Sequence, residues 1–125
     1  MEIKAACSCE GQTLDRFLQP TVIAFLSKEP LHGYSLVEKL KDSPLMNGVA
    51  PDSMGVYRLL KRLEDQGLVA HAWNDSEEGP AKRVYELTTS GRHCLTQWIH
   101  TLEAYQFNIM QLVDMIRICA QEDES

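Results

Sequence analysis

The feature that most constrains the fold is a helix followed at once by a short hairpin, both carrying basic residues, between residues 52 and 91. Four apolar residues share the spacing of a single helix face: Val56, Leu59, Leu60 and Leu63. Asp52 is placed to cap the start of this helix, and Gly67 suits the left-handed position just past its end. The spacing predicts a helix over residues 53–66 that buries one face and exposes the other.

Two strands are expected after this helix, over residues 68–73 and 83–87, on either side of a polar loop. The loop ends in the run Gly79-Pro80-Ala81-Lys82-Arg83. An exposed basic helix followed by a basic hairpin is typical of the winged-helix fold, in which the helix enters the major groove of DNA and the hairpin, or wing, contacts the flanking backbone. We therefore expect a mainly α fold with a small β-hairpin, and double-stranded DNA as the partner.

Eight residues on these two elements are candidate DNA contacts: Ser53, Met54, Tyr57, Arg58, Lys61, Arg62, Lys82 and Arg83. The hydroxyl groups and lysines suit phosphate oxygens, whereas Met54 and Arg58 are better placed for base edges. Two alternatives stay open. Arg62 could instead pair with Glu64 or Asp65, and the acidic residues 77–78 could neutralise the tip of the hairpin.

The residues before the basic helix predict two shorter helices. Proline is tolerated at a first helical position, so Pro20 is expected to start a helix over residues 20–26, after a turn that it interrupts. A second helix is expected over residues 33–40, where Gly33 allows close approach to a neighbouring element. These elements define a winged helix-turn-helix domain over residues 13–88, preceded by an irregular arm over residues 1–12.

The clearest periodicity follows Thr88, which is expected to cap the last helix. Eight residues alternate spacings of three and four without a break: Leu95, Trp98, Leu102, Tyr105, Ile109, Leu112, Ile116 and Cys119. Such a seam is typical of a coiled coil. A helix over residues 89–120 would be about 45 Å long, more than a small domain can cover. We therefore expect a dimerisation helix that pairs with a second copy, followed by an acidic tail over residues 121–125.

Composition and charge narrow the classes of protein. The 125 residues fit one domain, and the acids behind the net charge of −6 gather near both ends, away from the basic helix. No apolar run approaches the roughly 18 residues that span a bilayer, and the N-terminus lacks a signal-peptide pattern, so we expect a cytoplasmic protein with no membrane partner. The four histidines form no catalytic motif and no glycine-rich phosphate loop is present, which argues against an enzyme.

Three blocks resemble the PadR family of bacterial transcriptional repressors, in that family's order and spacing: PLHGYSL at residues 30–36, VYRLLKRLE at residues 56–64 and GPAKRVYELT at residues 79–88. The resemblance covers residues 20–116, and the single C-terminal helix is similar to the smaller of the family's subgroups. It implies a homodimeric repressor that binds a pseudo-palindromic operator and releases it on sensing an effector.

Some members of that subgroup bind flat aromatic drugs between their two C-terminal helices, stacked on a tryptophan. At the matching position this sequence has Leu102, and Trp98 lies one turn earlier. Trp98 and Leu102 are a candidate effector pocket between the two protomers. The simpler expectation for Trp73, Trp98 and Tyr105 is that they pack in the core or in the dimer interface.

The cysteines suggest another kind of sensing. Cys7 and Cys9 could share a soft metal ion, with Cys119 adding a ligand, or they could respond to oxidants. Structural, reduced thiols are the simpler alternative.

A different class of function, favoured by the acidic net charge, is a winged-helix module that binds protein instead of DNA.

Overall fold

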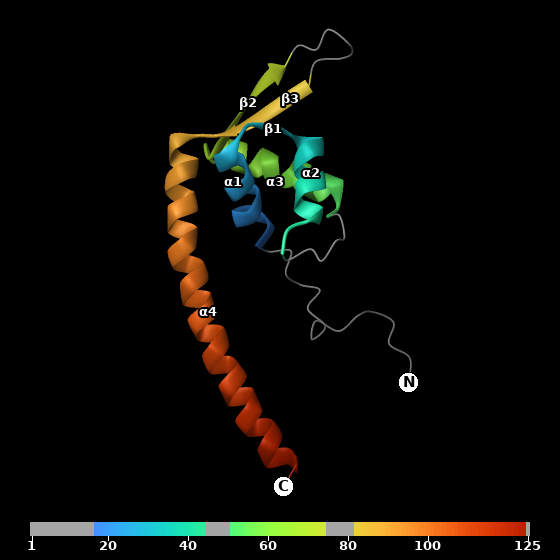
Figure 1. Ribbon diagram of the computed structural model, residues 1–125. Coiled ribbons are helices and arrows are strands. Elements are labelled where there is room, and N and C mark those ends of the chain that lie inside the picture. The colour runs from blue at the N-terminus through green and yellow to red at the C-terminus, as the bar shows by residue number, and fades with distance from the viewer. Residues whose placement is uncertain (1–16, 45–50, 75–81, 125) are drawn as a thin grey trace, which may run out of the picture.

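The computed structural model describes residues 17–44, 51–74 and 82–124. The elements follow one another in this order: α1 (Leu18–Lys28), β1 (Leu31–His32), α2 (Gly33–Lys41), α3 (Ser53–Asp65), β2 (Val69–Asn74), β3 (Lys82–Leu87) and α4 (Thr89–Glu124). The three shorter helices gather at one side of a small sheet, and α4 leaves this domain as a long separate helix (Figure 1). The expected fold class, mainly α with a small β-hairpin and a long C-terminal helix, is confirmed.

The core lies where α1, α2 and α3 meet beneath the sheet. Fourteen apolar residues make it up: Val22, Ile23, Leu26, Leu31, Leu36, Val37, Leu40, Val56, Leu59, Leu60, Leu63, Val69, Tyr85 and Leu87. The four residues that predicted the buried face of α3 are all among them, each 4% exposed or less. Burial of this stripe fixes which side of α3 faces outward, because residues between the stripe positions must point away from the core.

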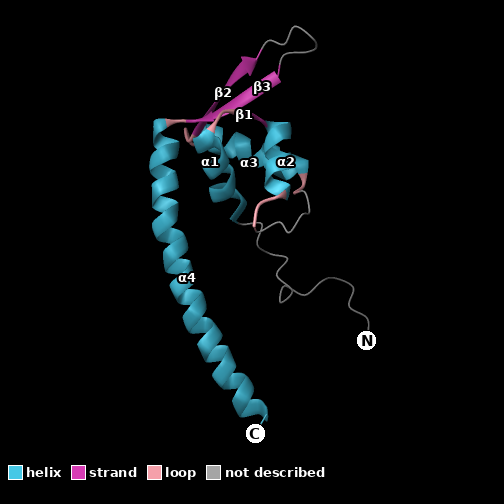
Figure 2. Cartoon of the chain, in the orientation of Figure 1, coloured by secondary structure: helices cyan, strands magenta, loops and turns pink. Residues whose placement is uncertain are grey.

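The sheet has the order β1-β3-β2, with both pairs antiparallel (Figure 2). β2 and β3 form the expected hairpin, in register from Val69 opposite Leu87 to Asn74 opposite Lys82. The short strand β1 was not expected from the sequence. It pairs Leu31 with Tyr85 on β3, and a strand of two residues has too few positions to show an alternating pattern.

Local signals set both ends of α3. The Asp52 side chain accepts a hydrogen bond from the Met54 amide at 3.3 Å, as expected for an N-cap. Gly67 has a φ of 76°, and the Gly67 and Leu68 amides donate to the carbonyls of Glu64 and Leu63, each at 2.9 Å. These two bonds form a Schellman motif, which requires the left-handed residue that glycine provides without strain.

The first helix begins earlier than the sequence indicated. Pro20 was expected to start the helix, but α1 begins at Leu18 and carries Pro20 as its third residue. Amides in the first turn of a helix have no intrahelical acceptor, so the missing N–H of proline removes no hydrogen bond there. The Thr21 hydroxyl also donates to the Phe17 carbonyl at 3.0 Å, which joins the first turn to the preceding residue.

The last helix is longer than expected. It continues to Glu124, so residues 121–124 of the expected acidic tail are helical. Thr88 caps its start as predicted, since its Oγ1 accepts from the Gly91 amide at 3.0 Å. Of the helices described, none combines the length and apolarity that crossing a bilayer requires.

Candidate nucleic-acid interface

The face of α3 opposite the core carries the candidate DNA contacts of this helix. Met54 is 67% exposed and Tyr57 is 46% exposed, and the cations between them and the end of the helix also face outward. Five of these side chains line one shallow concave surface: Met54, Tyr57, Arg58, Lys61 and Arg62. Aliphatic, aromatic and cationic groups thus lie together on one exposed strip, which is the mixture that contacts bases and phosphates of a duplex.

Two cations on this strip make ion pairs that water can break. Arg58 lies 3.8 Å from Asp52, and Lys61 lies 3.4 Å from Asp65. All four side chains are more than half exposed, and exposed pairs of this kind contribute little to stability. Phosphate oxygens can therefore compete for Arg58 and Lys61 at small cost.

The alternative ion pair considered for Arg62 is not formed. Asp65 pairs with Lys61, and Glu64 contacts His71 on β2. Across the described part of the chain, no acidic side chain pairs with Arg62. Neither Glu64 nor Asp65 therefore holds the Arg62 guanidinium group.

The wing brings its basic residues to the same side of the domain. Lys82 and Arg83, at the start of β3, share a hollow with Tyr57 of α3 and with the first residues of α2. Tyr34, at the start of α2, is a large exposed residue in this hollow. The start of α2 was not identified from the sequence as part of the candidate surface, because neither Tyr34 nor Ser35 is basic. Its proximity depends on the packing of α2 against α3.

Gly33 explains how α2 approaches the α3 face so closely. A Cβ atom added at Gly33 would overlap the Tyr57 ring and lie 2.8 Å from its hydroxyl oxygen. The structural role expected for Gly33 therefore fits the contact, and the partner is the candidate DNA-contacting tyrosine. Glycine at this position lets the ring lie directly against the start of α2.

Arg83 is held by two aromatic residues of the wing. Its guanidinium carbon lies 5.2 Å from the centre of the Trp73 ring, and its Nη1 donates to the Tyr85 hydroxyl at 3.5 Å. The hydrogen bond to the Tyr85 hydroxyl raises the pKa of Arg83 above its usual value. Trp73 is 58% exposed, so it does not pack in the core, which was one of the two places expected for it. It instead supports a cation on the surface.

The other candidate residues lie away from this face. Trp98 is partly buried and packs against the core, while Leu102 lines an apolar groove of about 620 Å³ between α1 and α4. Trp98 is not among the residues that line this groove, so the groove does not join the two candidate effector residues. Phe17 and Tyr105, whose ring centres are 6.0 Å apart, also line it.

The candidate metal ligands do not meet within the described residues. Cys119 is an exposed free thiol near the end of α4, and Cys7 and Cys9 lie outside the residues that the structure describes. In residues 17–44, 51–74 and 82–124, no three histidine, cysteine or acidic side chains cluster closely enough to hold a metal ion. The metal and thiol hypotheses therefore stay predictions from the sequence.

Known proteins share both the sequence pattern and the fold. Residues 22–97 match the model of the transcriptional regulator PadR-like family. A PadR family transcriptional regulator from Eggerthella lenta is 28% identical, with a TM-score of 0.73, over 85% of this chain and 90% of that one. A PadR-like transcriptional regulator from Bacillus cereus is 22% identical, with a TM-score of 0.67, over 82% and 96% of the two chains.

A structure of Bacillus subtilis PadR in complex with operator DNA is also similar, at 24% identity and a TM-score of 0.59, over 74% of this chain and 60% of that one. Comparison with curated protein sequences found no significant match.

Proposed function

This chain belongs to the PadR-like family of transcriptional regulators, and from that premise we propose that it is a repressor that binds a pseudo-palindromic operator as a homodimer. One observation carries the proposal. The exposed strip of α3 and the basic start of β3 lie on the same side of the domain, with Tyr57, Lys82 and Arg83 around one hollow. In this arrangement α3 enters the major groove and the wing contacts the flanking backbone.

The charges of this face support a duplex as partner in spite of the acidic chain. The net charge is −6, yet Arg58, Lys61 and Arg62 are the charged residues along the middle of α3. The local field at the contact surface matters more for association than the total charge does. The Bacillus subtilis protein of similar fold is known in complex with operator DNA, which agrees with a duplex as the partner.

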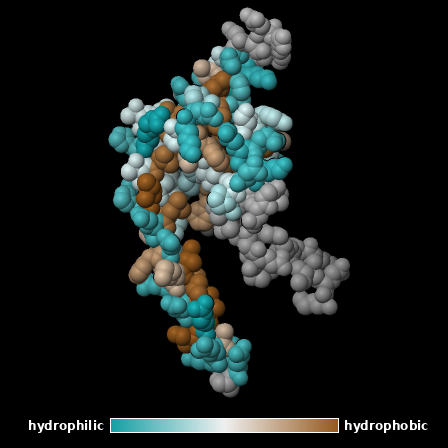
Figure 3. Space-filling model, viewed as in Figure 1, coloured by the Kyte–Doolittle hydropathy of each residue, from teal (hydrophilic) through white to brown (hydrophobic). Residues whose placement is uncertain are grey.

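Homodimerisation is proposed from the apolar surface of α4. From Leu102 onward every described residue of the helix is exposed, and the seam residues Leu102, Tyr105, Ile109, Leu112 and Ile116 are 37% to 54% exposed. Apolar (brown) side chains follow this free part of α4 in the space-filling view (Figure 3). Continuous apolar surface of this kind is covered by a partner in soluble proteins. The α4 helix of a second copy would cover this apolar surface with an identical one.

The apolar surface is broader than a two-helix seam requires. Residues outside the seam, among them Phe107, Met110 and Val113, are also exposed, and Met110 lines the groove between α1 and α4. We propose that the partner helix covers part of this groove and that an effector binds beside Leu102 and Trp98 at the interface. Such a molecule would release DNA by favouring a different spacing of the two α3 helices.

The proposal is tested first by selecting a duplex from a random-sequence pool with the wild-type protein and measuring its affinity over a range of salt concentrations. Tyr57→Ala and Arg58→Ala are expected to weaken binding by roughly tenfold or more each, because each removes a candidate phosphate or base contact. Lys82→Ala is expected to weaken binding to all sequences alike and to lower the salt slope by about one.

The matched control is Lys41→Ala, which removes an exposed cation at the far end of α2 and is expected to leave affinity nearly unchanged. A wild-type protein that selects no duplex, or that binds without dependence on salt, would favour a protein-binding module and contradict the proposal.

A further inference from the structure

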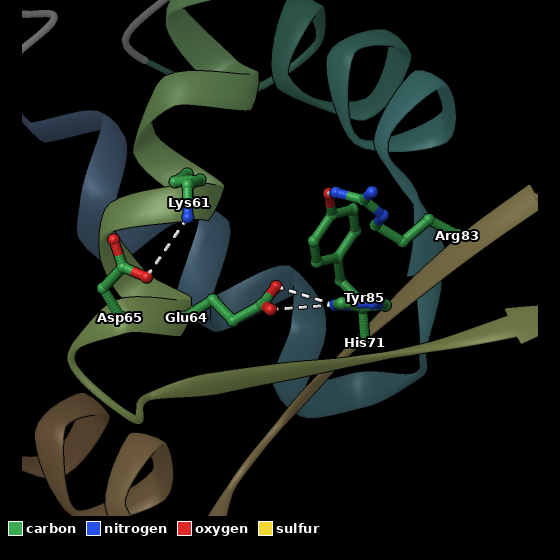
Figure 4. A network of polar contacts seen from close by, with 6 residues as sticks. All are labelled: Lys61, Glu64, Asp65, His71, Arg83 and Tyr85. Carbon is green, nitrogen blue, oxygen red and sulfur yellow. Dashed lines mark hydrogen bonds and ion pairs between the residues drawn. The ribbon is translucent and has the colours of Figure 1, made fainter.

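A polar contact joins α3 to the wing beside the Lys61–Asp65 pair (Figure 4). The Nδ1 atom of His71, on β2, lies 2.9 Å from both carboxylate oxygens of Glu64, on α3. The two side chains are 27% and 34% exposed, so this contact is better shielded than the Lys61–Asp65 pair on the neighbouring turn. Since both oxygens are acceptors, Nδ1 carries a proton, and the hydrogen bond orients the imidazole ring.

The oriented ring continues the contact toward the cation of the wing. The His71 ring lies edge-on to Trp73, with ring centres 6.0 Å apart, and 6.2 Å from the Tyr85 ring. Trp73 and Tyr85 are the two residues that hold Arg83. The Glu64 carboxylate also contributes to the raised pKa of Arg83 through its charge. A chain of direct contacts therefore leads from α3 to the guanidinium group.

We propose that Glu64 and His71 are positioning residues that fix Arg83 of the wing relative to α3, and that affinity for the operator depends on this coupling. The inference rests on the proposed function, because it assumes that α3 and Arg83 contact the same duplex. α3 and the wing can contact one duplex at the same time only at a fixed distance from each other. A mobile wing loses conformational entropy when it binds, and this loss lowers the affinity for DNA.

A substitution at Glu64 can change DNA affinity in two opposite directions, which separates the positioning role from the effect of its charge on phosphates. Glu64 is an anion on the helix that faces DNA, so removing its charge alone reduces repulsion of phosphates and strengthens binding. Losing the contact with His71 acts in the opposite direction, because it frees the wing. Glu64→Gln and Glu64→Ala remove the same charge, but the glutamine oxygen still accepts a hydrogen bond from Nδ1. The difference between these two variants isolates the contact.

The experiment compares both variants with wild type in binding the duplex that wild type selects from a random pool. Glu64→Gln is expected to bind as tightly as wild type or more tightly, and Glu64→Ala about fivefold more weakly than Glu64→Gln, the effect of one lost hydrogen bond. The control Asp65→Asn removes a charge one residue away and frees Lys61, so it is expected to bind more tightly. Equal affinities of Glu64→Gln and Glu64→Ala would overturn the proposal.

Double variants that also carry Arg83→Ala test whether Glu64 acts through Arg83. In an Arg83→Ala background the cation that Glu64 and His71 are proposed to position is absent, so Glu64→Ala and Glu64→Gln should then bind equally. A difference of the same size in both backgrounds would mean that Glu64 acts independently of Arg83, and the proposed chain of contacts would be wrong.

A measurement without DNA distinguishes failure of this inference from failure of the proposed function. The chain has two tryptophans, so Trp98→Phe leaves Trp73 as the fluorescent reporter. In that background Glu64→Ala is expected to give a higher acrylamide quenching constant than Glu64→Gln, because the released wing uncovers the Trp73 ring. Equal quenching would overturn the positioning role whether or not the protein binds DNA. Unequal quenching in a protein that binds no duplex would uphold the coupling and refute the proposed function.

Discussion

At the scale of single residues, one glycine controls the position of a candidate DNA contact. Gly33 has no side chain to keep the Tyr57 ring away, and a Cβ atom there would overlap the ring. Tyr57 is half exposed, so its ring can swing outward without disturbing the core. A methyl group at residue 33 therefore changes the interface more than it changes the fold.

Gly33→Ala is accordingly expected to weaken binding of the selected duplex by roughly tenfold, about the value of one hydrogen bond to a charged group. Its free energy of unfolding should change by less than about 1 kcal/mol, because the helix-forming preference of alanine offsets the displaced ring. Gly55→Ala is the counterpart, since its Cβ would lie 3.7 Å from an Asp52 oxygen, an ordinary contact. That variant should be more stable by about 0.5–1 kcal/mol. Unchanged duplex affinity in Gly33→Ala would contradict the assignment of Tyr57.

At the scale of elements, the junction between the wing and α4 is fixed by contacts to backbone carbonyl oxygens. The Thr88 hydroxyl donates to the Gly67 carbonyl at 2.6 Å, which joins the end of α3 to the start of α4. Gly91 lies in the first turn of α4, where a Cβ atom would meet the Leu68 carbonyl oxygen and the Leu87 side chain. A backbone oxygen cannot move aside as the end of a flexible side chain can.

Gly91→Ala should therefore destabilise the protein by about 1–3 kcal/mol, as overpacking typically does. Urea unfolding followed by circular dichroism measures this difference. Ser90→Ala is the matched control, because Ser90 is exposed in the same helical turn and should tolerate the change. If Gly91→Ala were as stable as Ser90→Ala, α4 would not pack against the hairpin as described.

The elements that could be predicted from the sequence are those set by neighbours along the chain. Asp52, Gly67 and Thr88 supply the ends of helices through their own side chains or backbone, and the apolar spacing of α3 reports its buried face directly. The strand β1 could not be predicted, because it exists through pairing with residues about fifty positions away. Contacts of the candidate interface that join residues distant in the sequence could not be predicted for the same reason.

The exposed cations of α3 follow from its periodicity, but their ion pairs do not. Glu64 has acidic and basic neighbours along the helix, and its contact with His71 on β2 depends on how the hairpin folds back over α3. Trp73 has the apolar character of a core residue, yet it lies on the half of β2 that extends beyond the core and supports Arg83. Position relative to the folded core decided both outcomes.

At the scale of the whole molecule, the chain divides into a part that buries its own core and a part that does not. Leu95 and Trp98 of α4 still pack against the core, whereas every described residue from Leu102 onward is exposed. A helix with few tertiary contacts is marginal in water, since packing rather than intrinsic preference stabilises most helices. The free part of α4 therefore depends on the proposed second copy.

Leu112→Asp tests this dependence at the middle of the exposed seam. In a dimer paired through α4 the new carboxylate would be buried against apolar side chains, which costs several kcal/mol without a partner for the charge. Sedimentation velocity is expected to change from dimer to monomer, and helical circular dichroism should fall as the free part of α4 frays. Gln111→Asp introduces the same group one residue away, outside the seam, and should remain dimeric.

Because a monomer presents one α3 helix, Leu112→Asp should also lose most of its affinity for the selected duplex while the core around Leu60 stays folded. A Leu112→Asp protein that sediments as the wild type does would exclude this helix as the interface.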